Sequence, residues 1–242
     1  MADNKVVGAW TDWSTEGWCA VITVNPSGPS ISAGTHVKYS DPSDSGLGPG
    51  SESLCYDTAS GKVIFAYWEW NANGGHKLMV RTGTVTGTNI TLGTPTEVHA
   101  VASQPHGKVT LCYDEYAQKS ILYYKRTDSG AVKLYARALT VSGTNITKGT
   151  EQLIEAPAGG KTFEKGPNNS FSYACCSTYV SHADVKKTLV IRAGGDSGNN
   201  GGLPKATFTH LNKTSLTVDL SQGNSFELDM DTHTGVDGDI EG

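Results

Sequence analysis

Four of the five tryptophans offer the clearest binding chemistry in this sequence. Trp13 and Trp18 flank one short loop, while Trp68 and Trp70 lie two residues apart, so that on a β-strand their side chains share one side. Exposed indole rings present flat apolar faces on which a sugar ring or a protein partner can pack. We therefore predict a ligand-binding face built from Trp13, Trp18, Trp68 and Trp70. The other interpretation, which is the favoured one, is that these rings pack between neighbouring blades of a repeat fold.

A second group of candidate residues is acidic. The segment from Asp219 to Gly242 contains seven carboxylates and no Lys or Arg. Oxygen-rich clusters of this kind can hold calcium, and the candidate ligands are Asp229, Asp231, Asp237 and Asp239. The spacing differs from that of a calcium loop such as the EF-hand. The favoured interpretation is a solvated acidic segment, with no cofactor and with calcium as the alternative.

The sequence contains no recognisable catalytic motif. It lacks a nucleophile elbow, an H-E-x-x-H motif, a P-loop and a dinucleotide-binding glycine fingerprint. Arg81 and Arg137 occupy equivalent repeat positions and are interpreted as scaffold, and nothing marks the convergence of arginines, an acid and a tyrosine that a sialidase-like site needs. We predict a protein that is not an enzyme. A glycan-cleaving enzyme, with paired carboxylates from distant loops, is the less favoured alternative.

Charge and cysteine content exclude several classes of protein. A net charge of −5 and a pI near 5.8 argue against nucleic-acid binding. No apolar run approaches the ~20 residues of a membrane helix, and MADNKVVGAW does not resemble a signal peptide. The five cysteines are odd in number and form no C-x-x-C pair, which favours buried, reduced thiols over a secreted disulfide framework.

Internal repeats determine the predicted fold. Gly87–Thr91 returns as Gly143–Thr147 after 56 residues, and Leu54–Asp57 returns as Leu111–Asp114 after 57 residues. Each repeat contains four short alternating segments separated by turn residues, which indicates four antiparallel strands. Four-stranded units at this period are typical of propeller blades. Two stacked β-sandwiches built from the same strands, or a ring shared between chains, are the alternatives.

The ends of the sequence predict how the ring closes. Lys5–Trp13 matches Lys62–Trp70, so the first repeat begins at its second strand. Leu228–Gly235 aligns with Leu54–Gly61 over eight positions and supplies the missing first strand. We therefore predict one all-β domain over residues 1–242, a four-bladed β-propeller closed by pairing of the C-terminal strand with the N-terminal blade. The predicted blades are 5–39 plus 224–235, 51–99, 107–155 and 169–221.

One carboxylate recurs at the end of the first strand of the repeats, as Asp57, Asp114 and Asp231. A short carboxylate at this position can accept hydrogen bonds from turn amides, so we interpret it as structural. Longer loops connect successive repeats, whereas the turns between third and fourth strands are minimal. Any binding site is therefore expected on the face of the longer loops.

Two repeat units resemble those of bacteriophage virion proteins. They are V-(S/T)-G-T-N-I-T-x-G-T, at Val85–Thr94 and Val141–Thr150, and Y-D-x-x-(S)-G-K-V-x-x-A-Y, at Tyr56–Tyr67. Tail-fibre and adhesin-like proteins of tailed phages often carry such repeats. The resemblance covers most of the chain, but only at the level of repeats, and it assigns no site residue.

The resemblance implies a structural protein of the virion surface, synthesised in the host cytoplasm without a signal peptide. The function expected from it is capsid decoration, as a knob, or a tail-associated role. Its expected partners are other virion proteins of the capsid or tail, with no nucleic acid and no membrane insertion. The alternative is a tail adhesin for a host-cell receptor, or a free lectin, with a cell-surface glycan as the partner.

Overall fold

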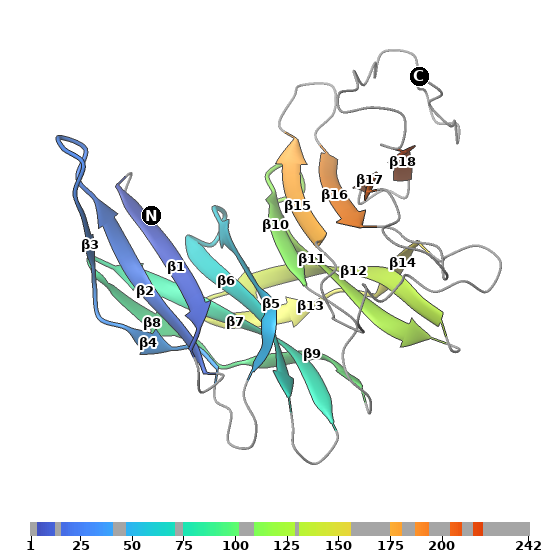
Figure 1. Ribbon diagram of the computed structural model, residues 1–242, viewed down its shortest axis with the longest axis horizontal. Helices are drawn as coiled ribbons and strands as arrows, with labels where there is room; N and C mark the ends of the chain where they lie inside the picture. Colours follow the sequence, from blue (N-terminus) through green and yellow to red (C-terminus); the bar gives the residue numbers. More distant parts are fainter. Residues whose placement is uncertain are drawn as a thin grey trace. The chain divides into compact units, whose positions relative to one another are not determined.

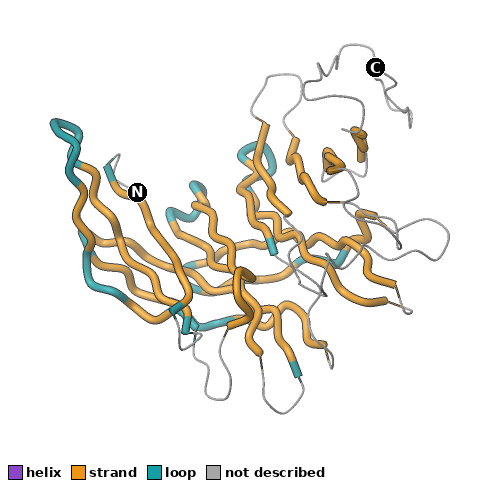
Figure 2. The backbone as a smooth tube through the Cα atoms, viewed as in Figure 1, coloured by secondary structure: helices purple, strands orange, loops and turns teal. Residues whose placement is uncertain are grey.

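The computed structural model describes residues 4–12, 16–40, 47–70, 75–101, 109–128, 131–155, 175–180, 187–193, 204–209 and 215–219. Every regular element in these ranges is a β-strand, which confirms the all-β prediction (Figure 2). None of these residues forms a helix that is long and apolar enough to cross a membrane.

The described strands form four antiparallel sheets, and each sheet takes its strands from one sequence repeat (Figure 1). Sheet 1 contains β1 (Lys5–Thr11), β2 (Gly17–Val24), β3 (Ile31–Ala33) and β4 (Val37–Lys38). Sheet 2 contains β5 (Leu47–Asp57), β6 (Lys62–Trp70), β7 (His76–Thr86), β8 (Asn89–Leu92) and β9 (Thr96–Val101). Sheet 3 contains β10 (Thr110–Asp114), β11 (Lys119–Asp128), β12 (Ala131–Ser142), β13 (Asn145–Lys148) and β14 (Gln152–Glu155). Sheet 4 contains β15 (Cys175–Val180), β16 (Lys187–Ala193), β17 (Pro204–Thr209) and β18 (Ser215–Asp219).

The chain divides into two compact units. Unit 1 comprises Met1–Pro105 and Ala138–Gly149, and unit 2 comprises His106–Arg137 and Thr150–Gly242. Unit 1 therefore holds sheets 1 and 2 together with β13 and the end of β12. Unit 2 holds β10, β11, the start of β12, β14 and sheet 4.

The core of unit 1 is shared by sheets 1 and 2. Val7 on β1 and Cys19 on β2 belong to the same buried cluster as Val63, Phe65 and Tyr67 on β6. The three β6 residues are two positions apart, so they lie on the same face of the strand, the face that meets sheet 1. Burial of such aromatic and aliphatic side chains contributes about 1.5–3 kcal/mol for each residue, and it joins the two sheets through their facing sides.

The fourth strand of the repeat is broken at a glycine rather than continuous. Gly34 separates β3 from β4, Gly93 separates β8 from β9, and Gly149 separates β13 from β14. The amide of each glycine donates a hydrogen bond to the strand that occupies the third position of its own repeat, β2, β7 or β12, with donor–acceptor distances of 2.8, 2.9 and 2.8 Å. The acceptors are the carbonyl oxygens of Val21, Thr82 and Ala138.

Two of these glycines touch the turn of the following repeat. A Cβ atom at Gly34 would lie 1.9 Å from the carbonyl oxygen of Thr88, and one at Gly93 would lie 2.6 Å from that of Thr144. Thr88 and Thr144 are the second residues of the turns between third and fourth strands. We call this contact the glycine–turn junction. The motif G-T-N-I-T-x-G-T contains both of its halves, so the junction gives the repeated sequence a physical reason.

A hairpin turn of the repeat requires a left-handed residue. Gly61 has φ of 67°, and Gln118, which occupies the equivalent position 57 residues later, has φ of 52°. The left-handed region costs a residue with a Cβ roughly 1–2 kcal/mol, part of which is offset by the greater unfolded-state entropy of glycine. We therefore expect Gln118→Gly to raise the free energy of unfolding by about 0.5–1 kcal/mol, measured by denaturant titration.

Gly61→Gln is the matched reverse substitution. It should lower the free energy of unfolding by a similar amount, because it places a Cβ in the same backbone conformation. A destabilising effect of Gln118→Gly would show that the Gln118 side chain contributes more than its backbone conformation costs.

Candidate functional site

Of the four tryptophans in the predicted ligand-binding face, the structure describes the side chains of Trp18 and Trp68. Trp68 is only 1% exposed, so its ring is not presented to a ligand, and that part of the prediction is corrected. Every residue from Val63 to Trp68 is buried, which shows that both faces of this strand are covered rather than one. Trp13 and the side chain of Trp70 lie outside the described residues.

Of the two predicted site residues whose side chains the structure describes, Trp18 is partly exposed. Its indole nitrogen Nε1 donates to Asp12 Oδ2 at 3.0 Å, and Lys38 Nζ lies 5.9 Å from the centre of the ring. Lys38 also forms an ion pair with Glu16. Trp10, which the sequence analysis left out, pairs directly with Trp18 across the β1–β2 hairpin. The cross-strand pair follows from the hairpin register, which spacing along the sequence alone does not fix.

The candidate metal ligands Asp229, Asp231, Asp237 and Asp239 lie outside the described residues. Among the residues that are described, no group of His, Cys, Asp or Glu could hold a metal ion.

The structural interpretation of the turn carboxylates is confirmed at Asp57 and Asp114, the two of them that lie within the described residues. Asp57 Oδ1 accepts from the Ser60 amide at 2.9 Å, and Asp114 Oδ1 accepts from the Ala117 amide at 2.8 Å.

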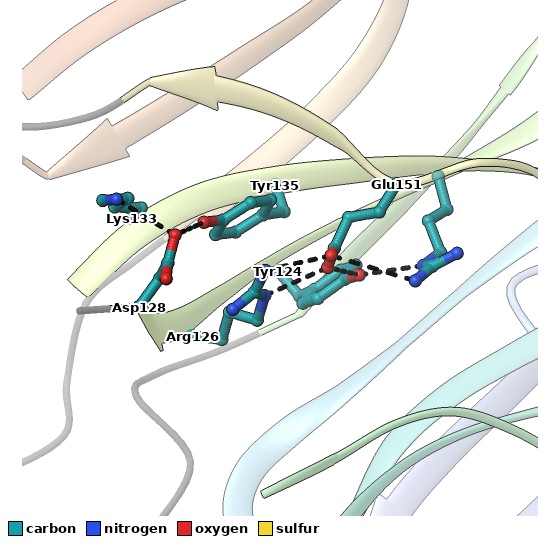
Figure 3. A network of polar contacts seen from close by, with 7 residues as sticks. Tyr124, Arg126, Asp128, Lys133, Tyr135 and Glu151 are labelled. Carbon is teal, nitrogen blue, oxygen red and sulfur yellow. Dashed lines mark hydrogen bonds and ion pairs between the residues drawn. The ribbon is translucent and has the colours of Figure 1, made fainter. Parts of the chain in front are cut away.

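A polar network in unit 2 is centred on Glu151 (Figure 3). Arg126 binds this carboxylate through two nitrogens, with Nε 3.1 Å from Oε1 and Nη2 3.1 Å from Oε2. The Tyr124 hydroxyl donates to Oε1 at 2.5 Å. Arg137 Nε in turn donates to the Tyr124 oxygen at 3.0 Å, and its Nη2 lies 3.9 Å from Glu151 Oε2. Glu151 is therefore held by two guanidinium groups and one phenol.

A second branch of the network is centred on Asp128. Its Oδ2 accepts from the Tyr135 hydroxyl at 2.7 Å and from Lys133 Nζ at 3.0 Å. The Arg126 guanidinium lies 4.1 Å from the centre of the Tyr135 ring and so joins the two branches by a cation–π contact. The close-up shows the Asp128 and Glu151 carboxylates on either side of this stacked pair (Figure 3).

Strand alternation positions the network. Its members on β11 are two residues apart, as are its members on β12, so each set lies on one face of its strand. Glu151 comes immediately before β14, which pairs with β12. The residues are Tyr124, Arg126 and Asp128 on β11, and Lys133, Tyr135 and Arg137 on β12. The sequence analysis missed this network, although the alternation Y-x-R-x-D followed by K-x-Y-x-R was a usable signal.

The electrostatics keep the acid ionised and the phenols protonated. Burial alone would raise the pKa of Glu151, but hydrogen bonds from Arg126 and Tyr124 outweigh it and hold that pKa below its ordinary value. Burial raises the pKa of Tyr124, and its hydrogen bond to Glu151 raises it further. Burial and the hydrogen bond to Asp128 raise the pKa of Tyr135 to about 12.

These directions limit the chemistry of the network. A general acid or base works best when its pKa lies near the operating pH, and the shifts of Glu151, Tyr124 and Tyr135 move away from neutrality. A tyrosine nucleophile is activated by a lowered pKa or by an adjacent base. The pKa of Tyr124 is raised, and the carboxylate beside it, Glu151, is a weakened base because its pKa is held below the ordinary value. Arginines, an acid and a tyrosine do converge here, contrary to the sequence analysis. Because Arg126 is bound on two nitrogens by Glu151, the arrangement suits cross-linking of strands better than acid–base catalysis.

Comparison with known proteins found no matching protein-family model, no matching curated protein and no matching solved structure. The resemblance to phage repeats therefore rests on the sequence motifs alone.

The buried thiols of Cys19 and Cys112 give a chemical test of the packing around each of these residues. Cys19 and Cys112 are buried and form no disulfide, and burial raises the pKa of each thiol to about 11. The thiolate is the reactive form, and an ordinary cysteine has a pKa near 8.5. We expect both residues to resist iodoacetamide at mildly alkaline pH in the folded chain and to react in denaturant, as measured by peptide mass spectrometry. Rapid alkylation of either thiol in the native chain would contradict the packing around it.

Proposed function

We propose that this chain is a non-enzymatic structural protein on the surface of a tailed-phage virion. It decorates the capsid, as a knob, or sits on the tail, and it acts by binding other virion proteins or a receptor. The glycine–turn junction carries this proposal. It places the motif that resembles phage virion repeats at the contacts between successive repeats, as expected of a protein whose role is to form a stable scaffold.

The four sheets are, in this proposal, the blades of a four-bladed propeller that forms one domain over residues 1–242. Sheet 1 supports this arrangement because β1 is the equivalent of β6, the second strand of sheet 2. In the described residues, sheets 2, 3 and 4 each have a strand before that position and sheet 1 has none. Residues 228–235, which lie outside the described residues, supply this strand and close the ring.

The non-enzymatic part of the proposal is supported by the network around Glu151. Its arginines and phenols bind the two carboxylates within the chain rather than leaving them for a substrate. The pKa directions of Glu151 and Tyr124 also oppose proton transfer near neutral pH.

Immunogold electron microscopy tests the virion location. Antibodies raised against the purified chain are added to intact particles of the phage that encodes it, and the expected result is regular labelling on the capsid or tail. Particles lacking the gene for this chain serve as the control. Absence of the chain from purified particles, with the protein abundant in infected cells, would overturn the proposal.

A receptor-binding adhesin or lectin is the second candidate function. The observation that favours it is the partly exposed Trp18, whose indole is fixed by Asp12 and bordered by Lys38. A fixed ring beside charged groups suits sugar stacking. The test is binding of labelled protein to a glycan array and to host cells. Saturable binding that Trp18→Ala removes, with an unchanged circular dichroism spectrum, supports this function, and absence of binding removes it.

A further inference from the structure

Trp18 and Tyr135 occupy equivalent positions in sheets 1 and 3. Each lies on the third strand of its repeat and pairs with the second part of the broken fourth strand, Trp18 with Lys38 on β4 and Tyr135 with Leu153 on β14. The two rings differ in exposure, because Tyr135 is only 4% exposed whereas Trp18 is partly exposed.

The neighbours of these two rings also correspond. Trp10 and Tyr124 each come five residues after the residue that begins β1 or β11. The Trp10 ring lies 5.1 Å from the ring of His36, and the Tyr124 hydroxyl donates to Glu151. His36 and Glu151 each come two residues before the residue that pairs with the aromatic ring of the third strand. The same positions therefore make contact in both sheets, with different side chains.

In sheet 3, an arginine of the same sheet covers the ring. The Arg126 guanidinium lies 4.1 Å from the centre of the Tyr135 ring, and Glu151 binds it on two nitrogens. A planar guanidinium can stack on an aromatic face while its nitrogens bind a carboxylate. Sheet 3 thus shows, inside the molecule, which chemical group this position of the repeat accommodates.

Sheet 1 has neither arginine of that arrangement. Asp12 stands at the position of Arg126, since each comes seven residues after the residue that begins β1 or β11. Ala20 stands at the position of Arg137, two residues after the aromatic ring of the third strand. An external guanidinium would therefore restore to sheet 1 the group that sheet 3 supplies from its own strands.

The cation over Trp18 is more distant than the one over Tyr135. Lys38 Nζ lies 5.9 Å from the centre of the indole, near the limit of roughly 6 Å for a cation–π contact, and it forms an ion pair with Glu16. Asp12 Oδ2 accepts from the indole Nε1 at 3.0 Å and so fixes the ring. The side chains of Lys38 and Glu16 are 35% and 28% exposed, so that solvent reaches this corner of the sheet.

We propose that Trp18 binds an arginine side chain of a partner protein, with the guanidinium stacked on the indole and its nitrogens directed at the Asp12 and Glu16 carboxylates. This inference rests on the proposed function, in which the chain binds other virion proteins, and it names the chemistry of the contact. Tryptophan is the best aromatic partner for a cation. Two carboxylates and one ammonium, that of Lys38, surround the ring, so the local charge attracts a cation rather than an anion.

Nuclear magnetic resonance of the full chain tests this site with a capped peptide that carries one arginine between two glycines. The matched control peptide carries citrulline, which has the shape of arginine without its charge. We expect the arginine peptide to cause a saturable shift of the Trp18 indole N–H resonance, which Trp18→Phe assigns. The citrulline peptide should bind about ten-fold more weakly. Equal binding of the two peptides would overturn the proposal.

Lys38→Gln gives a second readout, whose sign differs from that of structural damage. It should strengthen binding of the arginine peptide by about three-fold, because it removes a like charge beside the ring and releases Glu16. Lys77→Gln is the matched control, because it breaks the ion pair of Lys77 with Glu97 in sheet 2, where Met79 stands in place of the tryptophan. This control should leave the affinity unchanged. Weaker binding in Lys38→Gln would contradict recognition of a cation.

The remaining outcomes separate this inference from the proposed function. A shift of the Trp18 resonance with a neutral methyl glycoside, and none with the arginine peptide, would overturn the inference in favour of the second candidate function. No shift with either probe, from protein whose spectrum shows it to be folded, would overturn a ligand site at Trp18. Neither result affects the virion location, which immunogold labelling tests separately.

Discussion

Gly34→Ala is expected to lower the free energy of unfolding by about 3 kcal/mol, because overpacking against backbone atoms leaves little room for relief. A Cβ at this position would lie 1.9 Å from the Thr88 carbonyl oxygen and 3.0 Å from its carbonyl carbon. Both atoms belong to a tight turn, so the glycine–turn junction must open. The measurement is the denaturant midpoint at unchanged slope.

Gly75→Ala is the matched control for this substitution. A Cβ at Gly75 would have no heavy atom within 4 Å, so the same chemical change should alter stability by less than about 0.5 kcal/mol. A second test of the junction is Gly93→Ala, where a Cβ would lie 2.3 Å from Thr82 Oγ1 and 2.6 Å from the Thr144 carbonyl oxygen. If Gly34→Ala proved as mild as Gly75→Ala, the junction would not be a close contact in solution.

Glu151→Gln is expected to lower the free energy of unfolding by about 2 kcal/mol, less than for a fully buried pair because the groups are partly exposed. The substitution keeps the shape of the side chain and removes its charge. Arg126 and Arg137, which both lie within 4 Å of the carboxylate, then lose their shared counter-charge. Denaturant unfolding near neutral pH measures the difference.

The pH dependence of this effect has a defined sign. The folded-state pKa of Glu151 lies below its ordinary value of 4.5, so its stabilising effect is present above that value. It is lost as the pH falls through the lowered folded-state pKa. The stability difference between the natural chain and Glu151→Gln should therefore shrink in acid. A difference that stayed constant down to strongly acidic pH would contradict an ionised Glu151 at the centre of the network.

Glu97→Gln provides the comparison for an exposed ion pair. Glu97 lies 3.1 Å from Lys77, and both side chains are about half exposed. Exposed pairs of this kind contribute little, so we expect a change below about 0.5 kcal/mol. An equal loss of stability in Glu97→Gln and Glu151→Gln would show that Arg137 and Tyr124 add nothing to the stabilising effect of the Glu151 ion pair.

Much of the strand arrangement could be predicted from the sequence because the repeats preserve local contacts. The match between Lys5–Trp13 and Lys62–Trp70 predicted equivalent strands, and the structure gives β1 and β6, with the same lysine-to-threonine hydrogen bond in each sheet. The break in the fourth strand was missed. Its cause is a contact with the next repeat at Gly34 and Gly93, and hydrophobic alternation within one repeat carries no information about such a contact.

The candidate site was harder to predict for two different reasons. Trp68 lies in a strand that is buried on both faces, and alternation cannot distinguish a ligand-binding face from a packed one. The network around Glu151 joins β11 and β12 to a residue that immediately precedes β14. Comparison of the repeats emphasises residues that recur, and so it did not point to this network. Arg126, for example, stands where the second repeat has Glu69. The charge reversal marks where sheet 3 departs from the shared scaffold.

Amide hydrogen exchange of β1, measured residue by residue by NMR in the full chain, tests the closed ring most directly. Alternate amides of β1 point away from β2 and need a partner strand if they are to be protected. The account expects these amides to be protected as strongly as the corresponding amides of β6, which lies between β5 and β7. Rapid exchange of the alternate amides of β1, with those facing β2 protected, would show an open edge and contradict the closed propeller.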